Sequence, residues 1–309
     1  MVDEIGQLEA DHFDAIMRLW LAVDRVPALA MCGDKFQMAG YGDLRPWHSP
    51  RWRTTTFVTD LHQPYRCLDV RYNAILRTLR TCKPAAVSKR HLTVGKIMRG
   101  RRAWPGDAPT VDDIRRVLRE HPRTEILTCT RLGAHTINEL AVAAKFPRRL
   151  PLATIDGDLE ANPANYRSGR LLSDRGQLKA LRVQVYRGMS LYITQNIRKD
   201  TDVVNGMKAK VVGFDVRSKG LRLLTATGYK VVLWRWTDPE HGGRAFYPVR
   251  PGYASTVNKF QGAELEHVTL YLDCPGVPGA AYTAMSRVKR GRDCLIGGAV
   301  TRHHFTPAR

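Results

Sequence analysis

The sequence has few cysteines, and none of them forms a CxxC pair. The six cysteines stand singly along the 309 residues, at Cys32, Cys67, Cys82, Cys129, Cys274 and Cys294. Clustered cysteines are typical of structural zinc sites and of disulfide frameworks, so this spacing indicates neither. We interpret all six as reduced thiols of an intracellular protein.

Long apolar runs are also missing. No stretch reaches the roughly 18 consecutive apolar residues that a spanning helix needs. The first residues are acidic and lack the basic-then-apolar order of a signal peptide. We therefore expect neither a membrane-spanning helix nor a secretory leader.

Acidic residues are scarce relative to basic ones. Lys and Arg number 49 against 29 Asp and Glu, which gives a formal net charge of +20 at pH 7. A field of that sign attracts polyanions. Nucleic acid is the first candidate partner and an anionic membrane surface the second, while the plain alternative is a basic protein with a solvated surface. Hydrophobic residues make up 43% of the chain, enough for a sizeable core in one large or two modest domains.

Hydrophobic periodicity alternates between helices and short strands. It predicts helices at 10–23, 69–82, 111–120, 134–146 and 279–290, and strands at 28–32, 125–129, 267–273 and 293–298, the first of them buried. Thr110 and Asp113 have the spacing of a capping box at the start of the third helix. Residues 182–236 alternate in a β-rich pattern with turn signals, and 83–109 have the composition of a loose basic connector. The pattern predicts an α/β protein with one β-rich insertion.

The first candidate site residues are Asp3 and Glu4, which follow a very short apolar segment. A carboxylate at a strand end can hold Mg²⁺ through water, and its neighbour can polarise an attacking water; phosphoryl transfer needs both roles. Alone, such a pair is more often an exposed acidic surface. Further along, GDKFQ follows the segment ALAMC, so we expect Gln37 at the same sheet edge, where its amide can sense a γ-phosphate.

Other segments carry residues that suit phosphates. Arg66 precedes a predicted helix and Arg287 lies on the last predicted helix; an arginine delivered to a γ-phosphate neutralises the charge that develops there. The turn TVNKFQGAE offers donors for a single-strand phosphate backbone and one acceptor for a sugar hydroxyl or base edge, namely Thr256, Lys259, Gln261 and Glu264. Singly, each of these is most simply a surface residue.

Together and in this order, the segments DE, GDKFQ, YR, TVNKFQG and YTAMSRVKR resemble the motifs of the Pif/RecD branch of superfamily-one helicases. GDKFQ resembles the family's GDxxQ, TVNKFQG its TVHKSQG, and YTAMSRVKR its YVALSRVR. EILTCTRLGAHTINEL resembles the opening of the family's second motor domain. The resemblance runs from residue 2 to about 290 and is strongest at 2–8, 33–37 and 247–290.

The resemblance implies an α/β fold of RecA-like P-loop NTPase motor domains, the first one truncated, with a small SH3-like β insert. The implied boundaries are 1–60 for the C-terminal part of the first motor domain, 61–180 and 248–309 for the two parts of the second, and 181–247 for the insert. The implied activity is ATP-dependent 5′–3′ DNA unwinding with Mg²⁺, on single-stranded DNA or duplex junctions, in DNA repair and recombination. An intracellular location is implied, the nucleus if the source is a eukaryote.

Residue roles carry over by motif. Asp3 resembles the Mg²⁺ carboxylate, Glu4 the general base and Gln37 the γ-phosphate sensor. Arg66 and Arg287 resemble two arginine fingers; with Asp3 and Gln37 they would contact the nucleotide. The residues that fall where the family touches DNA are Thr128, Thr130, Thr256, Lys259, Gln261 and Glu264.

The chain also departs from the family pattern. Asn258 replaces the usual His and Phe260 the usual Ser, and 38–41 read MAGY where the family more often has LPPV. The larger departure is that GxxxxGK[ST] does not occur. TVGKIMRG has a Gly-Lys but lacks the earlier glycine and the following Ser/Thr, and we expect it in a loop. We therefore expect a truncated gene model or a split product, without the N-terminal quarter to half of a helicase and inactive alone.

Two interpretations stay open. One is an ATP-dependent DNA helicase fragment, and the other is a non-catalytic nucleic-acid-binding remnant that keeps the DNA track. A third, a viral-type RNA helicase, shares DE and GDxxQ, but AMSRV fits the Pif-like branch better.

Overall fold

The chain divides into two compact units. The computed structural model describes residues 1–23, 27–38, 44–61, 65–81, 94–167, 170–173, 177–237 and 243–308. Residues 1–107 with 260–309 form the first unit, and residues 108–259 form the second. Cys82 and the first part of the predicted connector, 83–93, lie outside the described residues. The domain boundaries predicted at 60, 180 and 247 remain a prediction.

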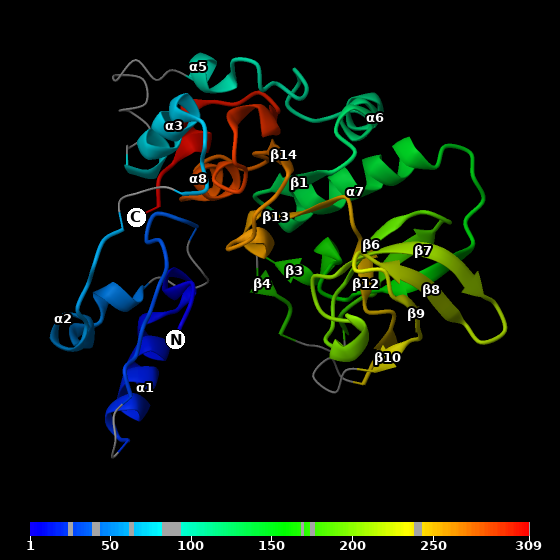
Figure 1. Cartoon of the computed structure of the whole chain (residues 1–309). Helices are drawn as coiled ribbons and strands as arrows, with labels where there is room; N and C mark the ends of the chain where they lie inside the picture. Colours follow the sequence, from blue (N-terminus) through cyan, green and yellow to red (C-terminus); the bar gives the residue numbers. More distant parts are fainter. Residues whose placement is uncertain are drawn as a thin grey trace. The chain divides into compact units, whose positions relative to one another are not determined.

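The first unit combines helices with one parallel strand pair. Among the described residues, its helices are α1 (Ala10–Leu21), α2 (Pro50–Thr55), α3 (Val70–Thr81), α5 (Val94–Met98) and α8 (Ala280–Met285), with short 3-10 turns η1 (Ile5–Gln7), η2 (Pro46–His48), η8 (Gly291–Asp293) and η9 (Arg302–Phe305) (Figure 1). Strands β14 (His267–Tyr271) and β15 (Cys294–Gly297) pair in parallel, with Val268 opposite Cys294. The predicted helices at 10–23 and 69–82 and the predicted strands at 267–273 and 293–298 are confirmed, whereas α8 is shorter than predicted.

An apolar cluster and a buried tryptophan stabilise this unit. Phe13 and Met17, one turn apart on α1, are buried with Ile5, and the Phe13 ring lies 5.4 Å from that of Trp52. Trp104 is fully buried and its ring covers Gly297. A Cβ atom at Gly297 would lie only 2.1 Å from the Trp104 ring, so this approach requires glycine at the end of β15.

Two sequence-based expectations for this unit are wrong. Residues 28–32 do not form a buried strand: they make one isolated parallel bridge, Val2 to Met31, and Ala30 and Cys32 are exposed. Among the described residues no further strand pairs with this bridge, although Leu29 and Met31 pack against the cluster of Ile5, Phe13 and Met17. The segment TVGKIMRG is not a loop, because 94–98 form helix α5, which buries Ile97 and Met98 despite its glycine.

The second unit begins with two helices and a parallel strand pair. Helices α6 (Val111–Glu120) and α7 (Arg131–Lys145) flank β1 (Thr124–Thr128), which pairs in parallel with β13 (Ala254–Thr256). The turn η7 (Val257–Phe260) follows β13 directly. These elements confirm the predicted helices at 111–120 and 134–146 and the predicted strand at 125–129. Together with the helices and the parallel strand pair of the first unit, these elements confirm the predicted α/β fold class.

A β-rich module follows α7. Strands β6 (Ser190–Ile193), β7 (Lys208–Asp215), β8 (Gly220–Thr225), β9 (Lys230–Leu233) and β12 (Val249–Pro251) form an antiparallel sheet in the order β12-β6-β7-β8-β9, here called the β module (Figure 1). Shorter antiparallel pairs are β2 (Ala153–Gly157) with β5 (Leu181–Val185), β3 (Tyr166–Arg167) with β4 (Arg170–Leu171), and β10 (Trp236–Thr237) with β11 (Ala245–Phe246). Two further short turns in the described part of this unit are η3 (Pro163–Asn165) and η5 (Lys199–Thr201). The β-rich character of 182–236 is confirmed; its SH3-like identity remains a prediction.

Helix α6 starts at the predicted capping box. The Asp113 N–H donates to Thr110 Oγ1 at 3.2 Å, and the Thr110 N–H donates to Asp113 Oδ2 at 3.1 Å. Thr110→Ala is therefore expected to lower the free energy of unfolding by about 1 kcal/mol, because N-cap side chains satisfy a helix-end N–H. Urea denaturation measures the change. Thr136→Ala is the matched control, since Thr136 is exposed inside α7 and bonds only the Leu132 carbonyl of its own helix; equal losses in the two variants would contradict the capping role.

In the part of the chain that the structure describes, no helix combines the length and apolarity needed to cross a bilayer.

Candidate functional site

Asp3 is an exposed carboxylate fixed by two hydrogen bonds. Its Oδ1 accepts the Glu4 N–H at 2.8 Å and the Cys32 thiol at 3.1 Å. The bond from Cys32, and next that from the Glu4 N–H, hold the pKa of Asp3 below its ordinary value. Asp3 is therefore ionised at neutral pH and oriented by the segment that pairs with residue 2.

Glu4 meets a distant part of the chain. Its oxygen Oε2 accepts from Gln261 Nε2 at 3.3 Å, and a Cβ atom at Gly262 would lie 3.3 Å from its Oε1. Gly262 has φ +79°, a conformation that favours glycine. Glu4 itself has φ +52°, which is uncommon for a residue with a side chain and is found at functional sites more often than elsewhere. The first predicted motif and the TVNKFQG turn thus lie together.

The GDKFQ loop is held by two helices. Asp34 accepts from Arg80 of α3 at 3.1 Å and from the Tyr282 hydroxyl of α8 at 2.8 Å. The Met38 N–H donates to Thr283 Oγ1 at 2.6 Å. Gln37, the predicted phosphate sensor, has a buried Oε1 with no hydrogen-bond partner among the described residues. The loop is therefore fixed next to α8, with one amide oxygen left for another group.

The two predicted arginine fingers lie beside the same loop and helix. Arg287 is 1% exposed, and its guanidinium donates to the Thr283 carbonyl at 2.8 Å, to Ser286 Oγ at 2.8 Å and to the Ala263 carbonyl at 3.4 Å. Burial, and then the Arg66 cation, lower the pKa of Arg287 to about 10, while Glu4 opposes the shift. Arg287 is thus still charged at pH 7 and lies within electrostatic reach of both residues.

Arg66 and Glu264 form a second pair there. Arg66 Nη1 donates to the Ser286 carbonyl at 3.3 Å, and Arg66 Nε lies 3.8 Å from Glu264 Oε2. Glu264 also pairs with Lys289 Nζ at 2.7 Å. Gln261 and Glu264, predicted to contact DNA, therefore bond Glu4 and these two cations in this structure.

The other predicted DNA residues lie in the second unit. Thr256 and Lys259 line a pocket of about 310 Å³, whose other polar side chains are Arg131, His135, Asn138, Asp158, Glu160, Thr194, Gln195, Asn205, Arg250 and Ser255. Thr130 caps α7 by accepting the Gly133 N–H at 2.9 Å. Thr128 is fully buried and donates to the Thr130 carbonyl at 2.8 Å. The hydroxyl of Thr128 thus faces protein, whereas Thr256 and Lys259 face the pocket.

Several of these functional candidates were not identified from sequence. Arg80 lies outside the quoted motifs. Tyr282 opens YTAMSRVKR but was not singled out as a site residue. Both bind Asp34 of GDKFQ. Arg131 and Arg250 line the pocket. They lie in segments that resemble the family, at 125–140 and 247–290, but neither was singled out as a site residue. Only their position in the folded unit brings them to the site, because the partners are separated by many residues along the chain.

The predicted Mg²⁺ site rests on one carboxylate, that of Asp3. Among the described residues, no group of three or more His, Cys, Asp or Glu side chains has the arrangement of a metal site. Mg²⁺ is usually bound by one or two carboxylates together with substrate phosphates and waters, so the ionised Asp3 fits such a site.

Sequence comparison relates the chain to helicases, although no family model matches it. The ATP-dependent DNA helicase PIF1 of Rattus norvegicus is 26% identical over 320 residues, which cover 94% of this chain and 44% of that protein. The PIF1 helicase of Homo sapiens is 25% identical over 315 residues, with the same coverage. The chain thus spans less than half the length of these curated relatives.

Solved structures agree on the fold. A structure of Pif1 helicases at forked double-stranded DNA has a TM-score of 0.67 and 16% identity, covering 98% of this chain and 70% of that one. Pif1 from Candida albicans has a TM-score of 0.64 and 17% identity, covering 99% and 74%. Bacteroides Pif1 in complex with ADP-AlF3 and single-stranded DNA has a TM-score of 0.65 and 14% identity, covering 98% and 71%. This chain is thus similar in sequence to part of the PIF1 helicases and in fold to solved Pif1 structures, which confirms the predicted α/β fold with RecA-like domains.

Proposed function

We propose that this chain is part of an ATP-dependent 5′–3′ DNA helicase of the Pif1 type. The observation that carries the proposal is the meeting of Glu4 with Gln261 and Gly262, more than 250 residues away along the chain. A carboxylate in a left-handed backbone conformation, an amide oxygen without a partner at Gln37 and two clustered arginines suit the hydrolysis of a phosphoanhydride.

Each residue has a separate task in this proposal. Asp3 would hold Mg²⁺, which when bound supplies positive charge to the phosphates. Glu4 orients and deprotonates the attacking water, with Gln261 steadying its second oxygen. Gln37 accepts a hydrogen bond from that water through Oε1, and its amide nitrogen can donate to the γ-phosphate. Arg66 and Arg287 neutralise charge on the leaving phosphates, once a nucleotide is held by a phosphate-binding loop.

A second candidate is a nucleic-acid-binding remnant without ATPase activity. It is favoured by one observation, the absence of GxxxxGK[ST] from the sequence. The coding sequence upstream of Met1 separates the two: an in-frame GxxxxGK[ST] supports the helicase, and a stop codon without one supports the remnant. Roles in DNA repair and recombination, and an intracellular or nuclear location, belong to the helicase proposal.

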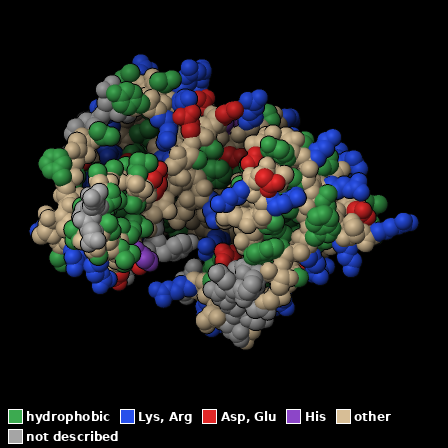
Figure 2. Space-filling view, turned by 60° about the horizontal axis from the view of Figure 1, so that its bottom comes forward, with side chains coloured by type: hydrophobic (Ala, Val, Ile, Leu, Met, Phe, Trp, Pro, Cys, Tyr) green, Lys and Arg blue, Asp and Glu red, His purple; other side chains and the backbone are tan. Residues whose placement is uncertain are grey.

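Single-stranded DNA is the proposed track. Lys and Arg side chains are scattered over the face shown in Figure 2, in line with the net charge of +20. The pocket in the second unit adds hydrogen-bonding side chains from α7, β12 and β13, and Bacteroides Pif1 binds single-stranded DNA. Positive charge with local polar contacts suits a phosphate backbone.

The chain is therefore expected to bind an oligo(dT) strand with a steep salt dependence. Lys259→Ala should reduce the slope of log K against log salt by about 0.7, the loss of one phosphate contact on a single strand. Fluorescence anisotropy from 50 to 300 mM salt measures it. Lys230→Ala on β9, also exposed but outside the pocket, is the matched control. A salt-independent affinity, or equal slope changes in both variants, would contradict the proposed track.

A further inference from the structure

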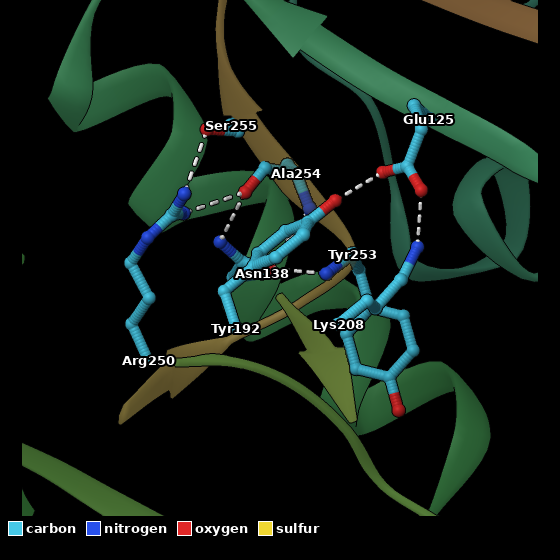
Figure 3. Close-up of polar contacts among 8 residues, drawn as sticks. All are labelled: Glu125, Asn138, Tyr192, Lys208, Arg250, Tyr253, Ala254 and Ser255. Atoms are coloured by element: carbon cyan, nitrogen blue, oxygen red, sulfur yellow. Dashed lines mark hydrogen bonds and ion pairs between the residues drawn. The ribbon is translucent and has the colours of Figure 1, made fainter. Parts of the chain in front are cut away.

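A buried polar network ties the β module to β1. The Tyr192 hydroxyl of β6 donates to Glu125 Oε2 of β1 at 2.5 Å, and Lys208 Nζ of β7 forms an ion pair with the other Glu125 oxygen (Figure 3). Tyr192 is 3% exposed. Its burial raises the pKa of the phenol, so Tyr192 remains a hydrogen-bond donor at any physiological pH.

Arg250 extends the network to β13, the strand that ends at the pocket-lining Thr256. Its guanidinium lies 4.7 Å from the centre of the Tyr192 ring. It donates to Ser255 Oγ at 2.8 Å and to the Ala254 carbonyl at 3.3 Å (Figure 3). A desolvated cation over an aromatic face and two hydrogen bonds each stabilise this placement.

Asn138 of α7 also bonds the backbone of residues 253 and 254. Its Oδ1 accepts the N–H groups of Tyr253 and Ala254, both at 3.0 Å, and its Nδ2 donates to the Ala254 carbonyl at 3.1 Å. Residues 253–255 are thus fixed by side chains of α7 and β12. The next residues along the chain are Thr256 and, in η7, Lys259, which line the pocket.

We propose that Tyr192 and Arg250 are positioning residues, through which the β module holds residues 253–255 so that Thr256 and Lys259 face single-stranded DNA. This step rests on the proposed function for its ligand but not for its geometry. Tyr192 does not line the pocket. An effect of the Tyr192 hydroxyl on DNA binding is therefore indirect: its bond to Glu125 holds the ring against the Arg250 guanidinium, and Arg250 holds the Ala254 backbone.

The test compares Tyr192→Phe with Tyr186→Phe in the full chain. Tyr186 is also buried and bonds only Gln184 Oε1, at 2.8 Å, so it is a matched control on the same unit. Hydrogen exchange of residues 253–256 and oligo(dT) affinity at several salt concentrations are measured. Tyr192→Phe is expected to speed exchange there and weaken oligo(dT) binding by about 10-fold, the loss of one hydrogen bond to a charged group. The salt slope should stay unchanged, because no phosphate contact is removed.

Lys208→Gln is a second, milder variant, expected to shift both readouts in the same direction by about 3-fold, the size of an ordinary hydrogen bond. Unchanged exchange at 253–256 in Tyr192→Phe and Lys208→Gln overturns the inference, and so does a flatter salt slope, which would mean direct phosphate contact. If the wild-type chain binds no oligo(dT), the proposed DNA track fails, while the exchange rates still decide whether the network positions this segment.

Discussion

Replacement of Arg287 by alanine is expected to reduce ATP turnover by about 10³-fold or more, in a protein that joins this chain to a phosphate-binding loop. Arginines that neutralise a γ-phosphate contribute on the order of 10³–10⁵ in rate. Arg287 is charged, lies within electrostatic reach of Glu4 and Arg66, and is aimed by bonds to the Thr283 carbonyl and Ser286 Oγ. Oligo(dT) binding should persist, because the proposed DNA residues Thr256 and Lys259 belong to the other unit.

Two variants separate this role from a structural one. Arg287→Lys keeps the charge but loses the planar fork, so we expect partial recovery of turnover. Arg292→Ala is the control, since the Arg292 side chain is 73% exposed on the same segment of the chain. Thermal melting of all three variants reports the loss of the Arg287 hydrogen bonds. Wild-type turnover in a folded Arg287→Ala protein would refute the role.

The 309-residue chain by itself is expected to show no ATP hydrolysis. Asp3 and Glu4 can act on a nucleotide only if other groups hold its phosphates. That task normally falls to backbone N–H groups at a helix N-terminus and to the lysine of GxxxxGK[ST], a motif that the sequence does not contain. Arg66 and Arg287 do not replace it, because a guanidinium supplies charge to a phosphate but not the row of backbone N–H groups that holds it. An assay of released phosphate, with and without oligo(dT), measures this.

Periodicity predicted much of the fold because it is a local property. Phe13 and Met17 lie within α1, and the capping residue Thr110 directly precedes α6. Each signal is therefore next to or inside the helix that it predicts. Residues 28–32 were predicted wrongly, because the burial of a strand is not a local property. Their apolar composition suits a buried strand, but burial depends on neighbouring strands, and a single bridge to Val2 leaves Ala30 and Cys32 exposed.

Motifs predicted which residues gather, but not how they pair. Glu4 and Gln261 both come from recognised motifs, but their bond to each other was not predicted, and the DNA contact of Gln261 remains a prediction. Thr128 was predicted to contact DNA as well, but its hydroxyl is turned into the protein. The clamp on Asp34 was not predicted, since Arg80 and Tyr282 are 46 and 248 residues away along the chain. Such pairings follow from tertiary packing rather than from any local pattern.

The most direct test of the account is ATP turnover with and without oligo(dT), for this chain alone and for the protein that carries it after an in-frame GxxxxGK[ST] segment. Glu4→Gln is measured in both proteins. It replaces the proposed base by an amide whose oxygen can still accept the hydrogen bond from Gln261. We expect turnover only in the longer protein, stimulated by oligo(dT) and lowered by about 10²-fold or more in Glu4→Gln. DNA-stimulated turnover by the chain alone, or a longer protein in which Glu4→Gln changes nothing, would contradict the account.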